Sequence, residues 1–140
     1  STFKFNQIFR KITKYKKLSI KTVFVKGREY KITNYYEKIA KFEFNNLFKL
    51  NLGAEDFIQI AHYCNFIAIK NVPIFTKENI NKQQRFIIFI DIIYEKKIPM
   101  MLTSQTSLEN LDQSINLKKP FKRTISRIYE LTSKNLLWIF

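Results

Sequence analysis

A long helical pattern between two short apolar runs constrains the fold of this chain most strongly. The first run covers residues 66–69 and is closed by Lys70 and Asn71. Residues 77–96 follow with the length and apolarity of a packed helix, and residues 98–102 form the second run. Short, wholly apolar runs are typical of strands buried on both faces. A strand–helix–strand order predicts two parallel strands joined by a right-handed crossover.

The residues before this unit predict antiparallel strands instead. Residues 18–25 alternate in the manner of a strand, and residues 28–33 return after a turn at Lys26 and Gly27. Gly27 supplies the positive φ that a tight hairpin requires. A third strand over residues 38–44 completes a small antiparallel meander. One side of the first strand carries Leu18, Ile20, Thr22 and Phe24.

The remaining segments predict helices, and the whole chain reads as one unit. Two glycines and three prolines in 140 residues leave little room for a linker. The expected fold class is mixed α/β: an antiparallel β-meander, then a βαβ unit with parallel strands and flanking helices. Within one unit, 1–140, we expect a basic helical segment at 1–17, the meander at 18–44 and the α/β part at 53–133. Other helices are predicted at 3–12, from Gly53 to Cys64, at 107–111 with Ser107 as N-cap, and at 120–133.

Cysteine and histidine content excludes several kinds of site. With Cys64 as the single cysteine, an internal disulfide is impossible, which suits a reducing compartment. A zinc site needs about four ligands, and Cys64 and His62 cannot provide them. We expect Cys64 in the core and His62 at the surface. No stretch is long and apolar enough to span a membrane, and residues 1–17 lack the apolar centre of a signal peptide.

A net charge of +14 is typical of proteins with nucleic acid or acidic membranes as partners, and by itself it supports at most weak, salt-sensitive binding of a polyanion. The positive charge is densest between Arg10 and Lys31, where Glu29 is the single acidic residue and aromatic residues are interleaved. A second interpretation stays open. Lys, Asn, Ile, Phe and Tyr have A/T-rich codons, so genome composition alone would also produce this charge.

Four segments resemble one known family in order and spacing. The first is Lys26-Gly27-Arg28-Glu29, followed by a phenylalanine-rich strand that leads into a turn with Phe48 where the family often has cysteine. The second is Leu52-Gly53-Ala54-Glu55-Asp56-Phe57, with Ile60-Ala61 and a strand ending in Val72-Pro73 behind it. The third is Gln84-Arg85-Phe86-Ile87, with Ile90-Asp91 and Tyr94-Glu95. The fourth is Phe121-Lys122-Arg123-Thr124-Ile125-Ser126-Arg127-Ile128.

These segments are similar to the C-terminal part of the ZapE family, which comprises bacterial ZapE cell-division ATPases and their mitochondrial lactation-elevated-type relatives. The family pattern for the fourth segment is F-x-R-T-x-S-R-L, and for the third R-R-F-I-x-L-I-D-x-x-Y-D. In the third segment Gln84 replaces the first arginine and Glu95 the last aspartate. The resemblance extends over roughly residues 26–133.

The resemblance implies an AAA+-like P-loop ATPase that binds ATP and Mg²⁺ in its full-length form. A phosphate loop needs a glycine-rich turn ending in Gly-Lys-Ser/Thr. Here Gly27 and Gly53 stand far apart, and no apolar run ends in Asp-Glu, so both Walker motifs are absent. We therefore expect no catalytic residue, cofactor or metal site in this chain alone. The absent start Met suggests that the chain begins within a longer protein.

Arg123 and Arg127 are the first candidate site residues, because they are four apart on one helix face. Two neighbouring arginines can hold a phosphate and sense its charge in the transition state. The alternative is a structural ion pair with an acid such as Glu130. Arg85 has the same two readings: it pairs with an acid or caps a neighbouring element, or it belongs to the phosphate-sensing set. Asp91 needs a partner from another element.

Polar residues at the ends of the parallel strands are the second set of candidates. Asn71 closes the first of these strands, and Thr103 with Ser104 closes the second. Ligands of open α/β sheets lie at the carboxyl ends of strands. These positions also resemble the sensor strand of AAA+ folds, and a polar strand-ending turn is the alternative.

Three functional hypotheses remain. The first is the C-terminal region of a ZapE-type ATPase that remodels a protein client, such as a division or membrane-associated protein, together with the missing N-terminal half. Its compartment is the bacterial cytoplasm, peripheral to the membrane, or the mitochondrial interior. The second is a truncated or decayed remnant that survives as a binding or interaction module, or not as a functional protein at all. The third is a basic nucleic-acid-binding module. The apolar residues 136–140 are expected to pack against the body or the missing half.

Overall fold

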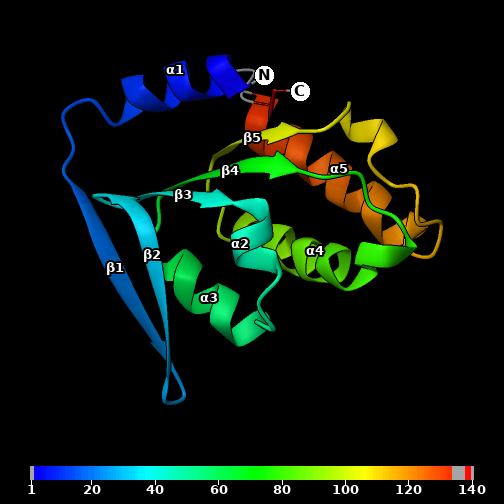
Figure 1. Ribbon diagram of the computed structural model, residues 1–140, viewed down its shortest axis with the longest axis horizontal. Helices are drawn as coiled ribbons and strands as arrows, with labels where there is room; N and C mark the ends of the chain where they lie inside the picture. The colour runs from blue at the N-terminus through cyan, green and yellow to red at the C-terminus, as the bar shows by residue number, and fades with distance from the viewer. Residues whose placement is uncertain (1, 134–137, 140) are drawn as a thin grey trace.

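The computed structural model describes residues 2–133 and 138–139. Figure 1 shows the course of the chain. Its elements are α1 (Thr2–Ile12), β1 (Leu18–Val25), β2 (Arg28–Tyr36), β3 (Ile39–Glu43), α2 (Phe44–Phe48), α3 (Ala54–His62), β4 (Phe66–Val72), the 3-10 turn η1 (Lys77–Asn79), α4 (Ile80–Glu95), β5 (Met100–Ser104), the 3-10 turn η2 (Leu108–Asn110), α5 (Lys118–Ser133) and β6 (Trp138–Ile139).

The strands form a single mixed sheet in the order β1-β2-β3-β4-β5-β6. Strands β1, β2 and β3 pair antiparallel, and β3, β4, β5 and β6 pair parallel. The predicted α/β class is therefore confirmed, including the antiparallel meander and the parallel pair that α4 connects. Strand β5 lies two residues later than expected, and η1 opens the long helix as a 3-10 turn.

Strand β3 also has a role that the sequence did not predict. It meets β2 at only two residue pairs, whereas it pairs with β4 in parallel along its whole length, from Ile39↔Phe66 to Glu43↔Lys70. Helices α2 and α3 form the crossover between β3 and β4. The physical reason is burial: Ile39 and Ala40 are both buried, one on each face, as in a central strand.

Helices cover the sheet unequally on its two sides. Helix α1 lies alone on one side, and α2, α3, α4 and α5 lie on the other (Figure 1). Phe5 and Phe9 of α1 pack on Ile39, Ala68 and Met101 in a small separate cluster. The main core on the other side is larger and strongly aromatic. The stability of the fold therefore depends mostly on the face that α2–α5 cover.

The β1–β2 hairpin extends beyond the helix layers and is half covered. Val23 is buried in the main core, on the side of α3. The alternate residues Leu18, Ile20 and Phe24 point the other way, where α1 does not reach, and are 53%, 63% and 68% exposed. A register irregularity lies between Ser19 and Lys21. The apolar side of β1 is thus on the surface.

The C-terminal apolar residues extend the sheet as far as the structure describes them. Trp138 and Ile139 form β6, which pairs with Leu102 and Thr103 of β5. The rest of the stretch at 136–140 lies outside the described residues. Within the described part of the chain, no helix has both the length and the apolarity to cross a membrane.

Cys64 gives the first test of the fold. The residue is buried at the end of α3, its thiol donates to the Ile60 carbonyl at 3.3 Å, and burial raises the pKa of the thiol to about 12. Because only the thiolate reacts, we expect alkylation of the folded chain at pH 8 to be slower than that of the urea-unfolded chain by about a hundredfold or more. Comparable labelling rates in the two states, measured by mass spectrometry, would show that the end of α3 is open.

Candidate functional site

The carboxyl ends of β3, β4 and β5 lie at one edge of the sheet, because these strands are parallel. A pocket of about 380 Å³ opens at this edge. It is lined by Thr2, Asn71, Val72, Pro73, Thr103, Ser104 and Gln105. The three strand-end residues that the sequence singled out, Asn71, Thr103 and Ser104, therefore share one pocket.

Asn71 is the residue that links the three strand ends. Its φ is 63°, a left-handed conformation that asparagine tolerates better than most residues. The turn takes its backbone N–H out of the ladder, and the N–H donates to the Thr103 hydroxyl at 2.8 Å. Its side-chain amide donates to Glu43 Oε1 at 2.9 Å. Asn71 thus connects β3, β4 and β5 through polar contacts.

The far wall of the pocket is held by the segment that follows β5. The Gln105 N–H donates to the Val72 carbonyl at 2.9 Å, and the Gln105 side chain accepts from the Ile74 N–H at 2.8 Å. The Ser104 hydroxyl donates to the Thr106 carbonyl at 2.6 Å. Thr103 and Ser104 are buried, so these bonds fix their hydroxyls. The polar groups of the pocket are therefore hydrogen-bonded to one another and to the backbone.

The pocket combines polar and apolar lining groups. Its lining groups are hydroxyls and amides together with the apolar side chains of Val72 and Pro73, and Glu43 is a carboxylate bonded to Asn71. No cluster of three or more potential metal ligands occurs among the described residues. Gly27 forms the hairpin turn at φ 78°, and Gly53 precedes α3, so neither belongs to a phosphate loop.

Arg127 lies apart from this pocket, between α4 and α5. Its guanidinium pairs with the Asp91 carboxylate and stacks 4.8 Å from the centre of the Tyr94 ring. Hydrogen bonding to the Glu130 carboxylate raises the pKa of Tyr94. The partner of Arg127 is therefore Asp91, from the neighbouring helix. Asp91 was expected to need a partner from another element, and Arg127 of α5 is that partner.

Arg85 and Arg123 occupy different environments. Arg85 donates to the Phe48 carbonyl at 2.9 Å, and a longer contact of 3.4 Å joins it to the Asn51 side chain, so it caps the end of α2. Arg123 is exposed on α5, and its side chain forms no ion pair with another described residue. The structure does not bring the three arginines together at the pocket.

Sequence reasoning missed two polar groups. Glu43 joins the strand-end cluster, but the meander interpretation gave no reason to place it beside Asn71. Gln83 is wholly buried in α4 and donates to Asp112 Oδ1 at 3.0 Å. The buried Ser114 hydroxyl lies 2.9 Å from Gln83 Oε1. A polar residue in an otherwise apolar helix stripe was the available signal for Gln83.

The two arginines of α5 give a matched test of structural roles. We expect Arg127→Ala to lower the free energy of unfolding by about 1–2 kcal/mol, because it leaves Asp91 without its partner in a partly buried position. Arg123→Ala should change it by less than about 0.5 kcal/mol, since the side chain is exposed. Urea denaturation measures the free energy of unfolding of both variants. Equal free energies would show that the Asp91–Arg127 pair does not stabilise the fold.

Comparison with known proteins shows which family this chain is similar to. The profile of the AFG1-like ATPase family matches residues 1–138. Cell division protein ZapE of Escherichia coli K12 is 27% identical over 82 residues, which cover 59% of this chain and 22% of that protein. Lactation elevated protein 1 homolog B of Danio rerio is 30% identical over 87 residues, which cover 62% of this chain and 17% of that protein. No solved structure matches the chain.

The matched region thus spans about a fifth of the length of these curated relatives. The family profile, in contrast, extends over nearly the whole chain, including α1 and the hairpin. The chain therefore belongs to the AFG1-like ATPase family.

Proposed function

We propose that these 140 residues act as the C-terminal region of a longer ZapE-type ATPase whose phosphate-binding loop lies in another part of the protein. The observation that carries this proposal is the family match over residues 1–138 in a chain with no glycine-rich phosphate loop. In the complete protein, ATP and Mg²⁺ are held by the missing ATPase half, and this region supports remodelling of a protein client. Its compartment is the bacterial cytoplasm or the mitochondrial interior.

The size of the natural protein tests this proposal. An antibody raised against the 140-residue chain should detect a polypeptide in cells of the source organism whose mass is clearly greater than the 16.9 kDa of this chain. The protein captured with that antibody should release phosphate from ATP in the presence of Mg²⁺, and the isolated 140-residue chain should not. A natural product of 16.9 kDa would favour the second hypothesis, a remnant that binds partners without hydrolysing ATP.

Within the complete ATPase, Arg123 is the arginine of α5 that remains available for a phosphate. Arg127 is engaged by Asp91, whereas Arg123 is exposed. We expect Arg123→Ala in the complete protein to lower kcat by about tenfold or more without a change in stability, because an arginine at developing charge acts chiefly in the transition state. The Lys122→Ala variant is the matched control, since Lys122 is a neighbouring exposed cation. Unchanged kcat in Arg123→Ala would remove Arg123 from the reaction.

A further inference from the structure

The segment from the end of α1 to β1 forms a basic–apolar face, which we define by its exposed residues. Its cations are Arg10, Lys11, Lys14, Lys16 and Lys17, all of them exposed. Its apolar members are Tyr15, which is 91% exposed, and the three outward residues of β1, namely Leu18, Ile20 and Phe24. Large apolar side chains and uncompensated cations are therefore concentrated within fifteen residues.

The positive charge of this face is not neutralised by nearby acids. The ion pairs among the described residues involve Lys26, Arg28, Lys31 and Arg127, and none involves a cation of the face. The Glu37 carboxylate accepts from the backbone N–H of Lys17 at 2.7 Å and forms no ion pair with the ammonium groups of the face. Lys14 Nζ lies 5.3 Å from the centre of the exposed Tyr15 ring, and all the lysines of the face are exposed and can meet an external anion.

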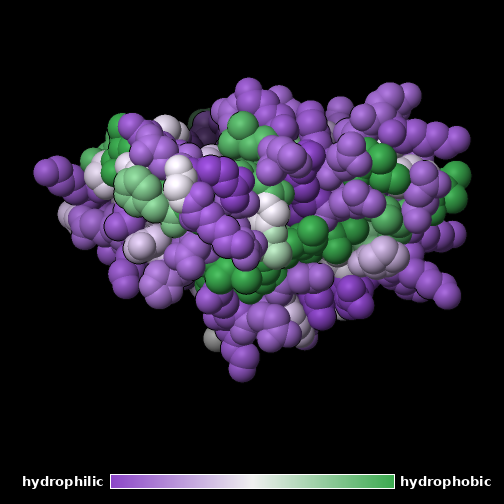
Figure 2. All heavy atoms as spheres, turned by 90° about the horizontal axis from the view of Figure 1, so that it is seen from below, coloured by the Kyte–Doolittle hydropathy of each residue, from purple (hydrophilic) through white to green (hydrophobic). Residues whose placement is uncertain are grey.

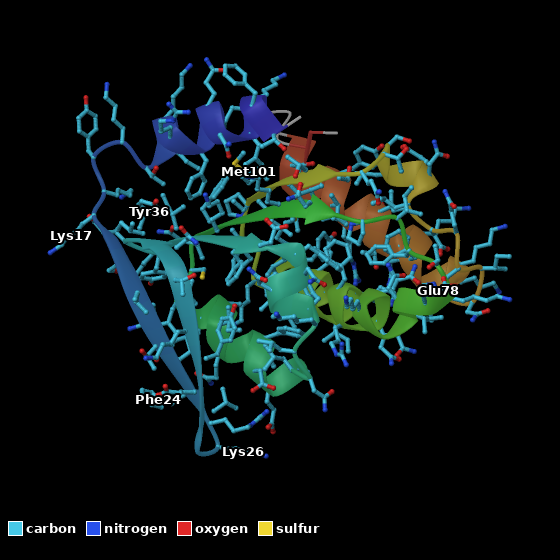
Figure 3. The ribbon with its side chains drawn as sticks, in the orientation of Figure 1. Lys17, Phe24, Lys26, Tyr36, Glu78 and Met101 are labelled. Atoms are coloured by element: carbon cyan, nitrogen blue, oxygen red, sulfur yellow. The ribbon has the colours of Figure 1, made fainter. Side chains whose placement is uncertain are left out.

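The three apolar members that belong to β1 lie on one side of the strand because its side chains alternate. Lys21 and Val23 face α3, where Lys21 lies 4.2 Å from the centre of the Tyr63 ring. Leu18 pairs with Tyr36, whose ring packs on Phe9 of α1, so the outward side of β1 continues the side that α1 occupies. In Figure 3, Lys17 and Phe24 lie along the outer side of the hairpin, with α3 on its inner side.

Outside this face, the large exposed apolar side chains of the described residues are dispersed in the sequence: they are Phe3, Leu50, Ile58, Ile88 and Ile115. The face of the molecule in Figure 2 is largely hydrophilic, with apolar residues in limited patches. Contiguous exposed apolar groups bordered by charge mark interaction sites. The outward residues of β1 are not part of the main core, because the contact of β1 with that core is made by Val23.

We propose that the basic–apolar face docks this protein on an anionic phospholipid bilayer. Aliphatic and phenyl side chains enter the interface between head groups and acyl chains, while lysines beside them pair with lipid phosphates and carboxylates. The two contributions act together, as stable peripheral attachment requires. A single-stranded nucleic acid would use aromatic stacking, to which Leu18 and Ile20 contribute nothing. The proposal does not depend on ATP binding.

Co-sedimentation of the 140-residue chain with lipid vesicles tests the proposal without nucleotide. The vesicles contain phosphatidylcholine alone or phosphatidylcholine with phosphatidylserine, and single-stranded oligothymidylate is titrated separately. We expect binding to the anionic vesicles that weakens as salt rises. The variant K14Q/K16Q/K17Q should bind these vesicles about a hundredfold more weakly, from the contribution of each lysine near an anionic surface.

A charge-matched variant separates this face from net charge. K118Q/K119Q/K122Q removes three exposed lysines from the start of α5, so it has the same formal charge as the first variant. We expect its vesicle binding to stay within about threefold of the parent chain, because those lysines lie outside the face. A third variant, L18T/I20T/F24T, keeps β propensity and should lose about tenfold or more in binding.

The outcomes decide the proposal. The proposal is supported if K14Q/K16Q/K17Q loses binding to anionic vesicles and K118Q/K119Q/K122Q does not. If L18T/I20T/F24T has a lowered melting temperature, the comparison of the two lysine variants is the test. Equal loss in the two lysine variants would attribute binding to net charge and overturn it. Equal binding to neutral vesicles, or binding to oligothymidylate without binding to vesicles, would also overturn it, the latter in favour of a nucleic-acid partner. None of these outcomes bears on ATP hydrolysis.

Discussion

Replacing Phe48 by alanine is expected to lower the free energy of unfolding by about 3–5 kcal/mol. The side chain is completely buried, and its ring lies between those of four other phenylalanines. The centroid distances are 4.7 Å to Phe44, 5.8 Å to Phe57, 5.5 Å to Phe86 and 5.6 Å to Phe89. Truncation removes the apolar contacts and leaves a cavity that helices α2, α3 and α4 cannot all close at once.

Phe24→Ala is the control for this loss, because it deletes the same atoms from an exposed position. Its effect should be below about 0.5 kcal/mol. Urea denaturation followed by circular dichroism gives both values, and the slope of the transition should be the same for each variant. A loss of less than about 1 kcal/mol in Phe48→Ala would show that the aromatic cluster is not the centre of the core.

Gln83→Ala is expected to cost about 2–3 kcal/mol, the second largest effect, for a polar reason. Gln83 Nε2 donates to Asp112 Oδ1 at 3.0 Å. The single hydroxyl proton of Ser114 serves one of two acceptors at a time, Gln83 Oε1 at 2.9 Å or Asp112 Oδ1 at 2.8 Å. Gln83 and Ser114 are both fully buried, so water does not readily replace the lost bonds. The contacts fasten α4 to the segment between β5 and α5.

Gln84→Ala provides a control one residue away, since Gln84 is exposed on the same helix. Alanine is at least as good a helix former as glutamine, so its stability should stay within about 0.5 kcal/mol of the parent. Hydrogen exchange adds a local measurement: amides at 105–117 should exchange faster in Gln83→Ala. If the two variants were equally stable, the buried network would contribute nothing to the attachment of that segment.

Local pattern was sufficient for most of the architecture. The hairpin, the long helix and the two strands around it follow from period, length and turn chemistry, which depend on residues close in sequence. The second parallel crossover did not follow from them. Its strand at residues 39–43 is short and alternating, and a sequence pattern cannot tell whether such a strand pairs on one edge or on both. The pairing of this strand with β4 depends on residues far apart in the chain, such as Ile39 and Phe66, which are 27 positions apart.

The same distinction applies to the candidate site. Asn71, Thr103 and Ser104 were identified from their places at strand ends, because parallel strands bring their carboxyl ends together. Glu43 was not, because its place beside Asn71 depends on the unpredicted β3–β4 pairing. The four-residue spacing of Arg123 and Arg127 predicted that both lie on one helix face. The packing of α4 against α5 determines that Arg127 pairs with Asp91 while Arg123 stays exposed.

The sequence alone determined the class of fold, the main secondary structure, the resemblance to an ATPase family and the absence of a phosphate loop from this chain. These features are encoded in spacing and residue type within short segments. Tertiary structure alone decided which side of β1 is covered, which strands β3 joins and which arginine is paired. Each of these depends on contacts between residues far apart in the chain, whose free energy exists only once the sheet and its helices have assembled.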